Sequence, residues 1–300
     1  MKLIDPTRYI KLKASGRLPS PKGLALAIVR LLQSDDYEIS ELVRLVKSDP
    51  AIAGEILKFS NAASYGRSRP IVSLSEAITT LGTLRVRAII LALTMLHDHR
   101  SGNCAKFNYE QFWSRSLATA IAAQSLASYV GINAEEHFTA GLLCCLGELA
   151  LASIFPDSYA KIVSQSETGS NKRIELERGA FGNDHRELCA NLLLEWGLPE
   201  ALITAVYYCE NPDGANFQEG SRMLGLTLSL NLALAIAKIC VADKGGRHQM
   251  LPNLYAKANR LKINSEELNS MSDGIIANWT EWGALLKIQT SEIATFAEII

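Results

Sequence analysis

The spacing of the apolar residues is the feature that most limits what this chain can fold into. Along most of the 300 residues, apolar side chains recur three or four positions apart, as in the stripe Ile39, Leu42, Leu45 and Val46. No convincing run of alternating apolar and polar residues interrupts this pattern. A period near 3.6 places such side chains on one face of a helix, whereas a half-buried strand needs a period of two. The sequence therefore predicts an all-α fold.

Local start and stop signals divide the pattern into separate helices. Asp49 followed by Pro50 is typical of an N-cap with a proline at the first helical position. Ser73 and Glu76 have the spacing of a capping box, and Gly82 is expected to end that helix. The predicted helices cover residues 24–33, 39–48, 50–61, 74–81, 83–96, 109–129, 134–154, 184–196, 199–209 and 224–242, with a further helical segment around 275–286.

Polar segments indicate how these helices group into units. Residues 97–103 (HDHRSGN) form a polar break, and residues 244–247 (KGGR) are expected to form a loop. We therefore expect two packed helical subdomains, an N-terminal helical bundle at 18–100 and a second helical subdomain at 105–242. Together they make one domain at 18–242, and a C-terminal helical extension follows at 243–300.

Charge and apolar composition exclude several classes of protein. The 30 Lys and Arg residues nearly balance the 31 Asp and Glu residues, so no global positive field recruits nucleic acid. The longest apolar run, residues 224–242, contains Ser229, Asn231 and Lys238, which suits a helix buried in protein better than a membrane span. The N-terminus lacks the apolar core of a signal peptide, and the six cysteines have no disulfide-scaffold spacing. A cytoplasmic protein with reduced cysteines is expected.

Several motifs, taken in order, resemble those of one family. The first half carries Leu18-Pro19, Asp49-Pro50, Leu57 to Asn61, Tyr65-Gly66 and Ser73 to Gly82. The second half carries FWSRSLA at 112–118, AGLL at 140–143, DH at 184–185 and WGLP at 196–199. From about residue 18 to residue 242 the chain resembles the HDOD proteins, the bacterial HD-related output domains.

This resemblance implies a second subdomain of the HD type, in which histidines and carboxylates bind divalent metals that activate water for phosphoester hydrolysis. Matched motif by motif, the family's ligand positions fall at Arg115, Cys144, Cys145, His185, Cys209, Glu210 and Asn231. Only His185 keeps a standard ligand, and Glu148 replaces a lysine that often follows the central doublet. An arginine neither binds a metal nor loses its proton. The resemblance therefore implies a degenerate metal site with no catalytic residue and no cofactor.

The adjacent cysteines in GLLCCLGELAL, residues 141–151, admit a second interpretation. Thiolates and an imidazole suit zinc, so Cys144, His185 and Cys209 with one water molecule would form an open zinc site. The alternative is that these cysteines are small buried hydrophobic residues that fill the space of the vanished ligands. No C-x-x-C spacing demands a metal.

Two further groups of residues are candidate binding surfaces. A cleft between the subdomains could hold a phosphate group if it is lined by Arg67, Arg69, Arg85, Arg87 and Arg115. The alternative is that these arginines pair with surface carboxylates. In the C-terminal segment, a partner surface or a contact with the second subdomain would be formed by Ile275, Trp279, Trp282 and Leu286.

These observations leave three classes of function. The resemblance implies a non-catalytic signal-transduction module, a regulatory protein that acts through protein–protein interaction with unidentified signalling partners in two-component or cyclic-dinucleotide pathways. The second class is a sensor of a phosphate-containing ligand, a nucleotide or cyclic dinucleotide, in the arginine-lined cleft. The third class is a metal-dependent phosphohydrolase with a site rebuilt from cysteine and histidine. We expect no enzyme activity, no nucleic acid partner and no membrane partner.

Overall fold

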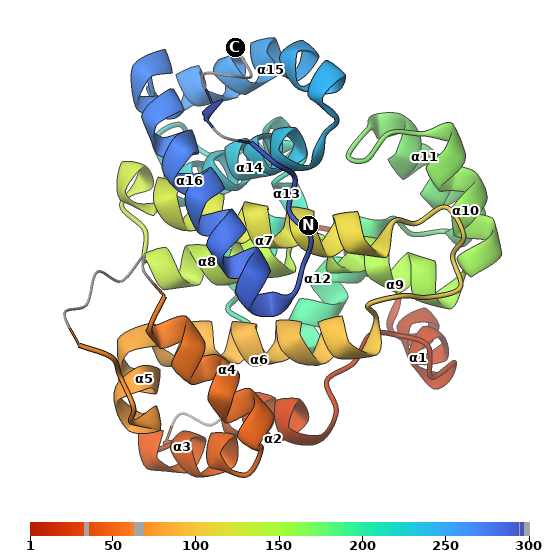
Figure 1. Ribbon diagram of the computed structural model, residues 1–300. Helices are drawn as coiled ribbons and strands as arrows, with labels where there is room; N and C mark the ends of the chain where they lie inside the picture. Colours follow the sequence, from red (N-terminus) through yellow and green to blue (C-terminus); the bar gives the residue numbers. More distant parts are fainter. Residues whose placement is uncertain (33–35, 63–68, 294, 297–300) are drawn as a thin grey trace.

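The computed structural model describes residues 1–32, 36–62, 69–293 and 295–296, and the regular elements in these ranges are all helices (Figure 1). The predicted all-α fold is confirmed. The chain begins with α1 (Pro6–Ala14), α2 (Gly23–Leu31), α3 (Ile39–Lys47), α4 (Pro50–Ser60), α5 (Leu74–Leu81) and α6 (Thr83–Asp98). It continues with α7 (Tyr109–Leu126), η2 (Ala127–Val130), α8 (Ala134–Leu143), α9 (Leu146–Ile154), α10 (Pro156–Gln165), α11 (Asn171–Phe181), α12 (His185–Glu195), α13 (Glu200–Tyr208), η3 (Pro212–Ala215), α14 (Arg222–Val241), α15 (Lys244–Arg260) and α16 (Ser265–Leu286).

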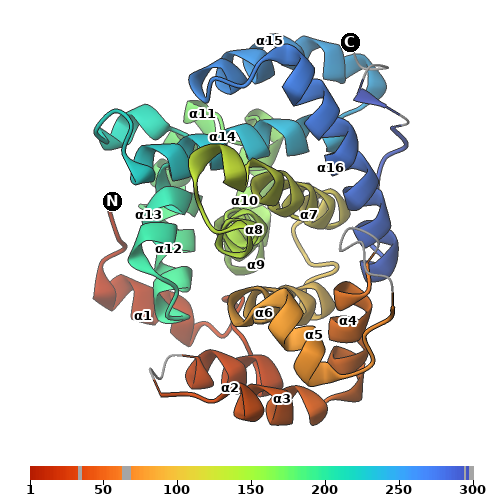
Figure 2. The ribbon, with the colours of Figure 1, turned by 90° about the vertical axis from the view of Figure 1, so that its left-hand side faces the viewer.

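The helices form two groups that meet along α6 and α8. Helices α2 to α6 lie together at one end, while α7, α8 and α14 pack against one another in the centre of the larger group (Figure 1). Helices α12 and α13 lie on one flank of the molecule, and α16 runs along another side from α15 toward α4 (Figure 2). The last helix therefore contacts both groups.

The capping signals read from the sequence act where they were predicted. The Asp49 carboxylate accepts hydrogen bonds from the backbone N–H groups of Ala51 and Ile52 at 3.0 and 3.1 Å, and α4 begins at Pro50. At the start of α5, Ser73 accepts from the N–H of Glu76 at 3.5 Å, which is the half of the predicted capping box that the structure shows. Gly82, with φ of +79°, separates α5 from α6, whose axes differ by 102°. This left-handed backbone conformation favours glycine and allows the sharp turn.

The predicted continuous helix at 134–154 is wrong, because the chain breaks into α8 and α9 at Cys144 and Cys145. The Cys144 thiol donates to the carbonyl of Gly141 at 3.2 Å, and Cys145 adopts φ −98° and ψ 3°. Close packing on both sides of the break leaves room only for glycine. A Cβ at position 141 would lie 2.7 Å from the carbonyl oxygen of Thr119, and one at Gly147 would overlap the backbone of α12.

The predicted loop at 244–247 is also wrong, because these residues form the first turn of α15. Glycines are tolerated in a first turn, where fewer helical hydrogen bonds depend on each residue. Arg247 is buried, and its Nε donates to the carbonyl of Ala242 at 3.0 Å, which fixes the start of the helix. Helices α10 and α11 were not predicted either.

The aromatic stripe of α16 is part of the core, so the prediction of a partner surface at this stripe is wrong. Ile275, Trp279 and Trp282 are at most 2% exposed, and Leu286 is half-buried. The indole N–H of Trp279 donates to the carbonyl of Ser114 on α7 at 2.9 Å. The C-terminal segment thus docks on the rest of the chain, as the alternative interpretation held.

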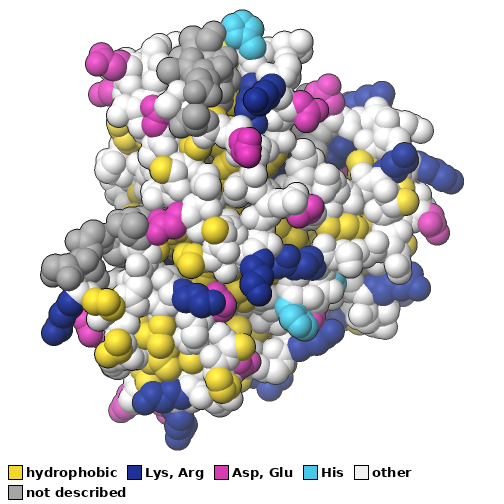
Figure 3. Space-filling view, viewed as in Figure 1, with side chains coloured by type: hydrophobic (Ala, Val, Ile, Leu, Met, Phe, Trp, Pro, Cys, Tyr) yellow, Lys and Arg dark blue, Asp and Glu magenta, His cyan; other side chains and the backbone are white. Residues whose placement is uncertain are grey.

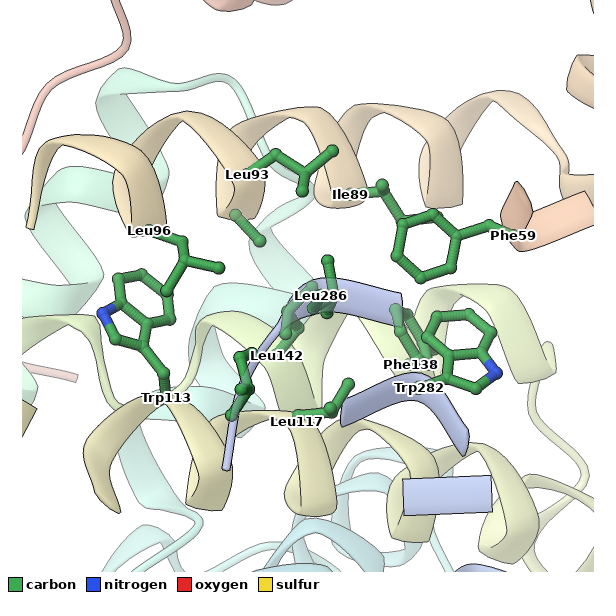
Figure 4. A pocket seen from close by; sticks show the side chains of 12 residues that line it. Phe59, Ile89, Leu93, Leu96, Trp113, Leu117, Phe138, Leu142, Trp282 and Leu286 are labelled. Carbon is green, nitrogen blue, oxygen red and sulfur yellow. The ribbon is translucent and has the colours of Figure 1, made fainter. Parts of the chain in front are cut away.

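Trp282 also connects the two groups of helices. Its ring centroid lies 4.6 Å from that of Phe59 on α4 and 5.3 Å from that of Phe138 on α8. These three rings border an apolar cavity of about 20 Å³, toward which Leu96 and Leu142 also point (Figure 4). A cavity of this size holds about one water molecule and leaves the junction nearly close-packed.

Two stretches in the described ranges are long and apolar enough, by length and composition alone, to cross a membrane, and a bent helix pair could make a third. They are residues 134–154 and 222–241. In each stretch most of the apolar part is buried inside the protein, 94% of it in residues 134–154 and 83% in residues 222–241.

Candidate functional site

The structure brings the seven predicted metal-site positions into one buried region. Arg115 comes from α7, Cys144 and Cys145 from the break before α9, His185 from the start of α12, and Asn231 from α14. Cys209 and Glu210 follow the end of α13. The region is filled by ion pairs and hydrogen bonds between these residues and their neighbours.

Arg115 forms an internal salt bridge. Its guanidinium lies 2.7 Å from Glu148 of α9, and the two side chains are only 9% and 3% exposed. Arg173 of α11 lies 3.8 Å from the other carboxylate oxygen. Burial alone would lower the pKa of Arg115, but the charge and hydrogen bond of Glu148, together with Cys145 and Glu210, raise this pKa above its usual value. The position therefore carries a permanent positive charge.

His185 lies between two carboxylates. Its Nδ1 is 2.6 Å from Glu177 of α11, and its Nε2 is 3.0 Å from Glu210. Burial would lower the pKa of His185, but the two carboxylates raise it well above its usual value, so the ring is an imidazolium that donates from both nitrogens. Burial would raise the pKa of Glu210, but the charge and hydrogen bond of His185, together with the charges of Lys238 and Arg186, lower it to about 2. Both ring nitrogens are occupied, so neither is available to a metal.

Sequence reasoning missed Glu177 and Arg173, although both form ion pairs in this region. Glu177 lies eight residues before its partner and across the turn that joins α11 to α12. The spacing rules for charged pairs apply within a helix, so they do not reach such contacts. Glu148 was noticed, but only as a departure from the family pattern.

The cysteines face one another and backbone carbonyls. The Sγ atoms of Cys144 and Cys145 are 3.6 Å apart, Cys189 approaches the carbonyls of residues 143 and 144, and Cys209 donates to Val206 at 3.0 Å. Hydrogen bonds with Cys145 and Cys209, together with burial, raise the pKa of Cys144 well above its usual value. Within the described ranges, no three His, Cys, Asp or Glu side chains are arranged to hold a metal ion. The zinc site of Cys144, His185 and Cys209 is therefore not formed.

The Asn231 position is linked to lysines. Its amide donates to the carbonyl of Cys209 at 2.6 Å and accepts a hydrogen bond from Lys257 of α15. Burial lowers the pKa of Lys257, and nearby Lys238 lowers it further. Lys238 itself donates to the carbonyl of Thr168 at 2.9 Å. Ammonium groups thus approach the region from the side of α14 and α15.

The structure does not assemble the predicted arginine cleft. Arg67 lies outside the described residues, and Arg69 is exposed. Arg85 is 1% exposed, pairs with Glu135 and lies over the rings of Phe138 and Trp282. Arg87 lines a pocket between α6, α8 and α13, while Arg115 lines another beside α10 and α14. The prediction of one cleft is wrong, because the core separates these side chains.

The pocket that Arg115 lines opens beside the ion-pair region and has a volume of about 400 Å³. Its walls come from α7, α14, the loop between α10 and α11, and α15. Its charged lining consists of Lys106, Arg115, Arg173 and Lys238 with Glu148 and Glu167. Of these six side chains, sequence reasoning had singled out Arg115 as a candidate site residue and noted Glu148 only as a change from the family pattern.

In fold, the chain belongs with all-helical proteins that include a candidate phosphohydrolase from Shewanella amazonensis. That structure is 21% identical, with a TM-score of 0.68, and the match covers 94% of this chain and 98% of that one. The HDOD domain matches residues 18–212, so the chain belongs to the HDOD family.

Two further proteins are similar in sequence. The MmoQ response regulator from Methylococcus capsulatus is 34% identical, with a TM-score of 0.52, over 83% of this chain and 95% of that one. An uncharacterized protein from Treponema pallidum is 25% identical over 197 residues, which is 65% of this chain. The match spans only 38% of that relative's length.

Proposed function

We propose that this HDOD protein is a non-catalytic signalling module that acts through protein–protein interaction. Membership of the HDOD family and the 34% identity to a response regulator support a role in signalling. The observation that carries the non-catalytic part is the set of internal ion pairs at the positions where HD proteins bind metal. Arg115 pairs with Glu148, and His185 is held between Glu177 and Glu210.

Metal-dependent hydrolysis needs a cation that activates water, and the buried side chains here oppose one. A divalent ion beside Arg115 would meet a fixed positive charge, and coordination by His185 would require the ring to lose a proton and leave a carboxylate. Each of these changes costs free energy, because each disturbs ion pairs that the buried side chains already form. The buried charges are instead balanced by neighbours within the chain.

A groove on the surface supports the interaction part of the proposal. It has a volume of about 780 Å³ and runs between α2, α4, α6 and the end of α16. Its apolar lining includes Leu24, Ile52, Leu93 and Leu285, and both acidic and basic side chains form its rim. Hydrophobic side chains also gather over α3 to α5 on the same face of the molecule (Figure 3). An apolar floor with a charged rim suits an amphipathic helix of a partner.

The non-catalytic part is tested by metal content and hydrolysis together. We expect less than about a tenth of an equivalent of zinc, iron or manganese by elemental mass spectrometry, after purification without a chelator or a metal-affinity column. We also expect no release of phosphate from nucleotides or cyclic dinucleotides with added Mn²⁺ or Mg²⁺. One equivalent of metal, lost in His185→Ala together with hydrolysis, would show that the protein is an enzyme.

The interaction part is tested with paired surface variants. Leu24→Glu and Leu285→Glu place a charge in the groove, while Val72→Glu changes a side chain that is 86% exposed and lies outside it. Immobilised wild-type protein and the Val72 variant should capture the same partner from a lysate of the producing cells. The groove variants should have unchanged circular dichroism spectra and should capture at least about tenfold less of this partner. Equal capture by all four proteins would contradict an interaction through this groove.

A further inference from the structure

The pocket beside Arg115 combines an excess of positive charge with an apolar wall. Its four cationic side chains, Lys106, Arg115, Arg173 and Lys238, face two carboxylates, those of Glu148 and Glu167. The lining therefore has two positive charges more than it has negative ones. Phe107, Phe112 and Met250 supply part of the remaining surface.

Two of the four cationic groups, those of Arg173 and Lys238, are held in place before any ligand arrives. Arg173 donates to the hydroxyl groups of Ser166 and Thr168 and to the carbonyl of Ser166 at 3.3, 2.9 and 2.6 Å. Lys238 donates to the carbonyl of Thr168 at 2.9 Å. Both cations are thus fixed to the loop between α10 and α11. Groups that are already ordered lose little conformational freedom on binding.

Arg115 adds a second, independent observation. Its side chain is 91% buried, and its Nε has no hydrogen-bond partner among the described residues. This Nε is itself buried, so a ligand in the pocket does not reach it, and Arg115 acts on an anion in the pocket through its permanent charge. Glu210, which lies near Lys238, is already paired with His185 and does not line the pocket.

We propose that this pocket binds a small phosphate monoester with an apolar or aromatic group, directly and without a metal. A phosphate monoester carries a charge of about −1.5 to −2 at neutral pH, which matches the two unbalanced positive charges of the lining, whereas a monocarboxylate leaves one of them unbalanced. Guanidinium groups bind phosphate oxygens in pairs. The volume of about 400 Å³ exceeds what inorganic phosphate fills, so the side of Phe107 and Phe112 is left for the organic group.

This inference rests on the proposed function, because the ligand would then be a signal and not a substrate. The pocket wall includes Met250 of α15, which belongs to the C-terminal segment, and side chains of α7 and α14 from the central group. A bound ligand would therefore connect these three elements. Ligand binding at this place would stabilise the arrangement of the C-terminal segment on the larger group of helices.

The test is equilibrium binding by calorimetry with the full chain in EDTA, using phenyl phosphate, inorganic phosphate and phenol as probes. We expect phenyl phosphate to bind with a Kd below about 1 mM, inorganic phosphate to bind several-fold more weakly, and phenol not to bind. Lys238→Met and Lys106→Ala should each weaken binding, by at least about tenfold for the half-buried Lys238 and about threefold for the exposed Lys106. Lys161→Ala, which removes an exposed charge on α10 outside the pocket, is the matched control.

Failure of this inference and failure of the proposed function give different results. The pocket proposal is overturned if neither phosphate probe binds with a Kd below about 10 mM, or if the Lys106 and Lys238 variants bind phenyl phosphate with the same Kd as the Lys161 control. Either result leaves the signalling role untouched. If phenyl phosphate binds and is hydrolysed only after Mn²⁺ is added, the pocket stands and the non-catalytic function is refuted. Binding in EDTA, with no turnover after Mn²⁺ is added, supports both.

Discussion

The buried pair of Arg115 and Glu148 gives the most direct test of the idea that ion pairs have replaced a metal centre. Arg115→Met keeps most of the side-chain volume but leaves Glu148 buried, with Arg173 at 3.8 Å as its remaining cation. Removing one partner of a buried pair costs about 3–5 kcal/mol of unfolding free energy, and Arg173 places this site near the lower value. Replacing both partners, in Arg115→Met with Glu148→Leu, should bring the protein back to within about 1 kcal/mol of wild type.

The assay is urea unfolding at neutral pH followed by far-UV circular dichroism, on the two single variants, the double variant and wild type. The double-mutant cycle then gives the interaction free energy between the two side chains. Arg260→Met is the control, because its pair with Asp213 is 38% and 74% exposed and should contribute less than about 1 kcal/mol. The reasoning is refuted if Arg115→Met costs no more than the control, or if the effects of the two single changes simply add.

Three further predictions concern packing and pH. Trp282→Ala should lower the free energy of unfolding by about 3–5 kcal/mol in the same assay, because it removes a ring that contacts both helix groups. Tyr129→Ala, at an exposed position, should lower it by less than about 1 kcal/mol. Similar losses in the two variants would contradict the docking of α16. Gly147→Ala should prevent accumulation of soluble protein because its Cβ overlaps the backbone of α12, while Gly179→Ala, with open space around it, should not; equal yields would contradict the close approach. Burial lowers the pKa of His137 to about 4, so the stability that this neutral ring contributes is present above pH 6.5 and lost as the pH falls toward 4. Between pH 7 and pH 4 the unfolding free energy of wild type should fall by up to about 3 kcal/mol more than that of His137→Gln. Parallel plots of unfolding free energy against pH for the two proteins would contradict this.

Local signals in the sequence predicted the fold class and several helix boundaries, because the contacts that set them lie within a few residues. Asp49 caps the two N–H groups that follow it, and Gly82 supplies the one backbone conformation that the turn needs. The Gly-Gly pair at 245–246 misled the prediction, since the same residues that favour a loop also occur in a first helical turn. The buried contact of Arg247 decides between the two, and that contact comes from tertiary structure.

The site was predictable in position but not in chemistry. Motif order placed Arg115, Cys144 and His185 where the structure brings them together. One of the two carboxylates that hold His185, that of Glu177, and one of the two cations beside Glu148, Arg173, come from α11, a helix the sequence did not reveal. Which charges meet in a core depends on how helices pack. The arginine cleft failed for a different reason, because Arg85 and Arg87 are two positions apart on α6, a spacing that turns their side chains to different sides of the helix.

The position of Trp282 has a consequence for how the protein is made. Phe59 and Phe138 are covered by this side chain, yet they precede it by more than a hundred residues in the chain. During synthesis on the ribosome the earlier helices emerge first, so their apolar junction stays open to water until α16 leaves the exit tunnel. Chaperones would meet that open junction in every unfinished chain, and a protein cut short before residue 282 would keep it for its whole lifetime.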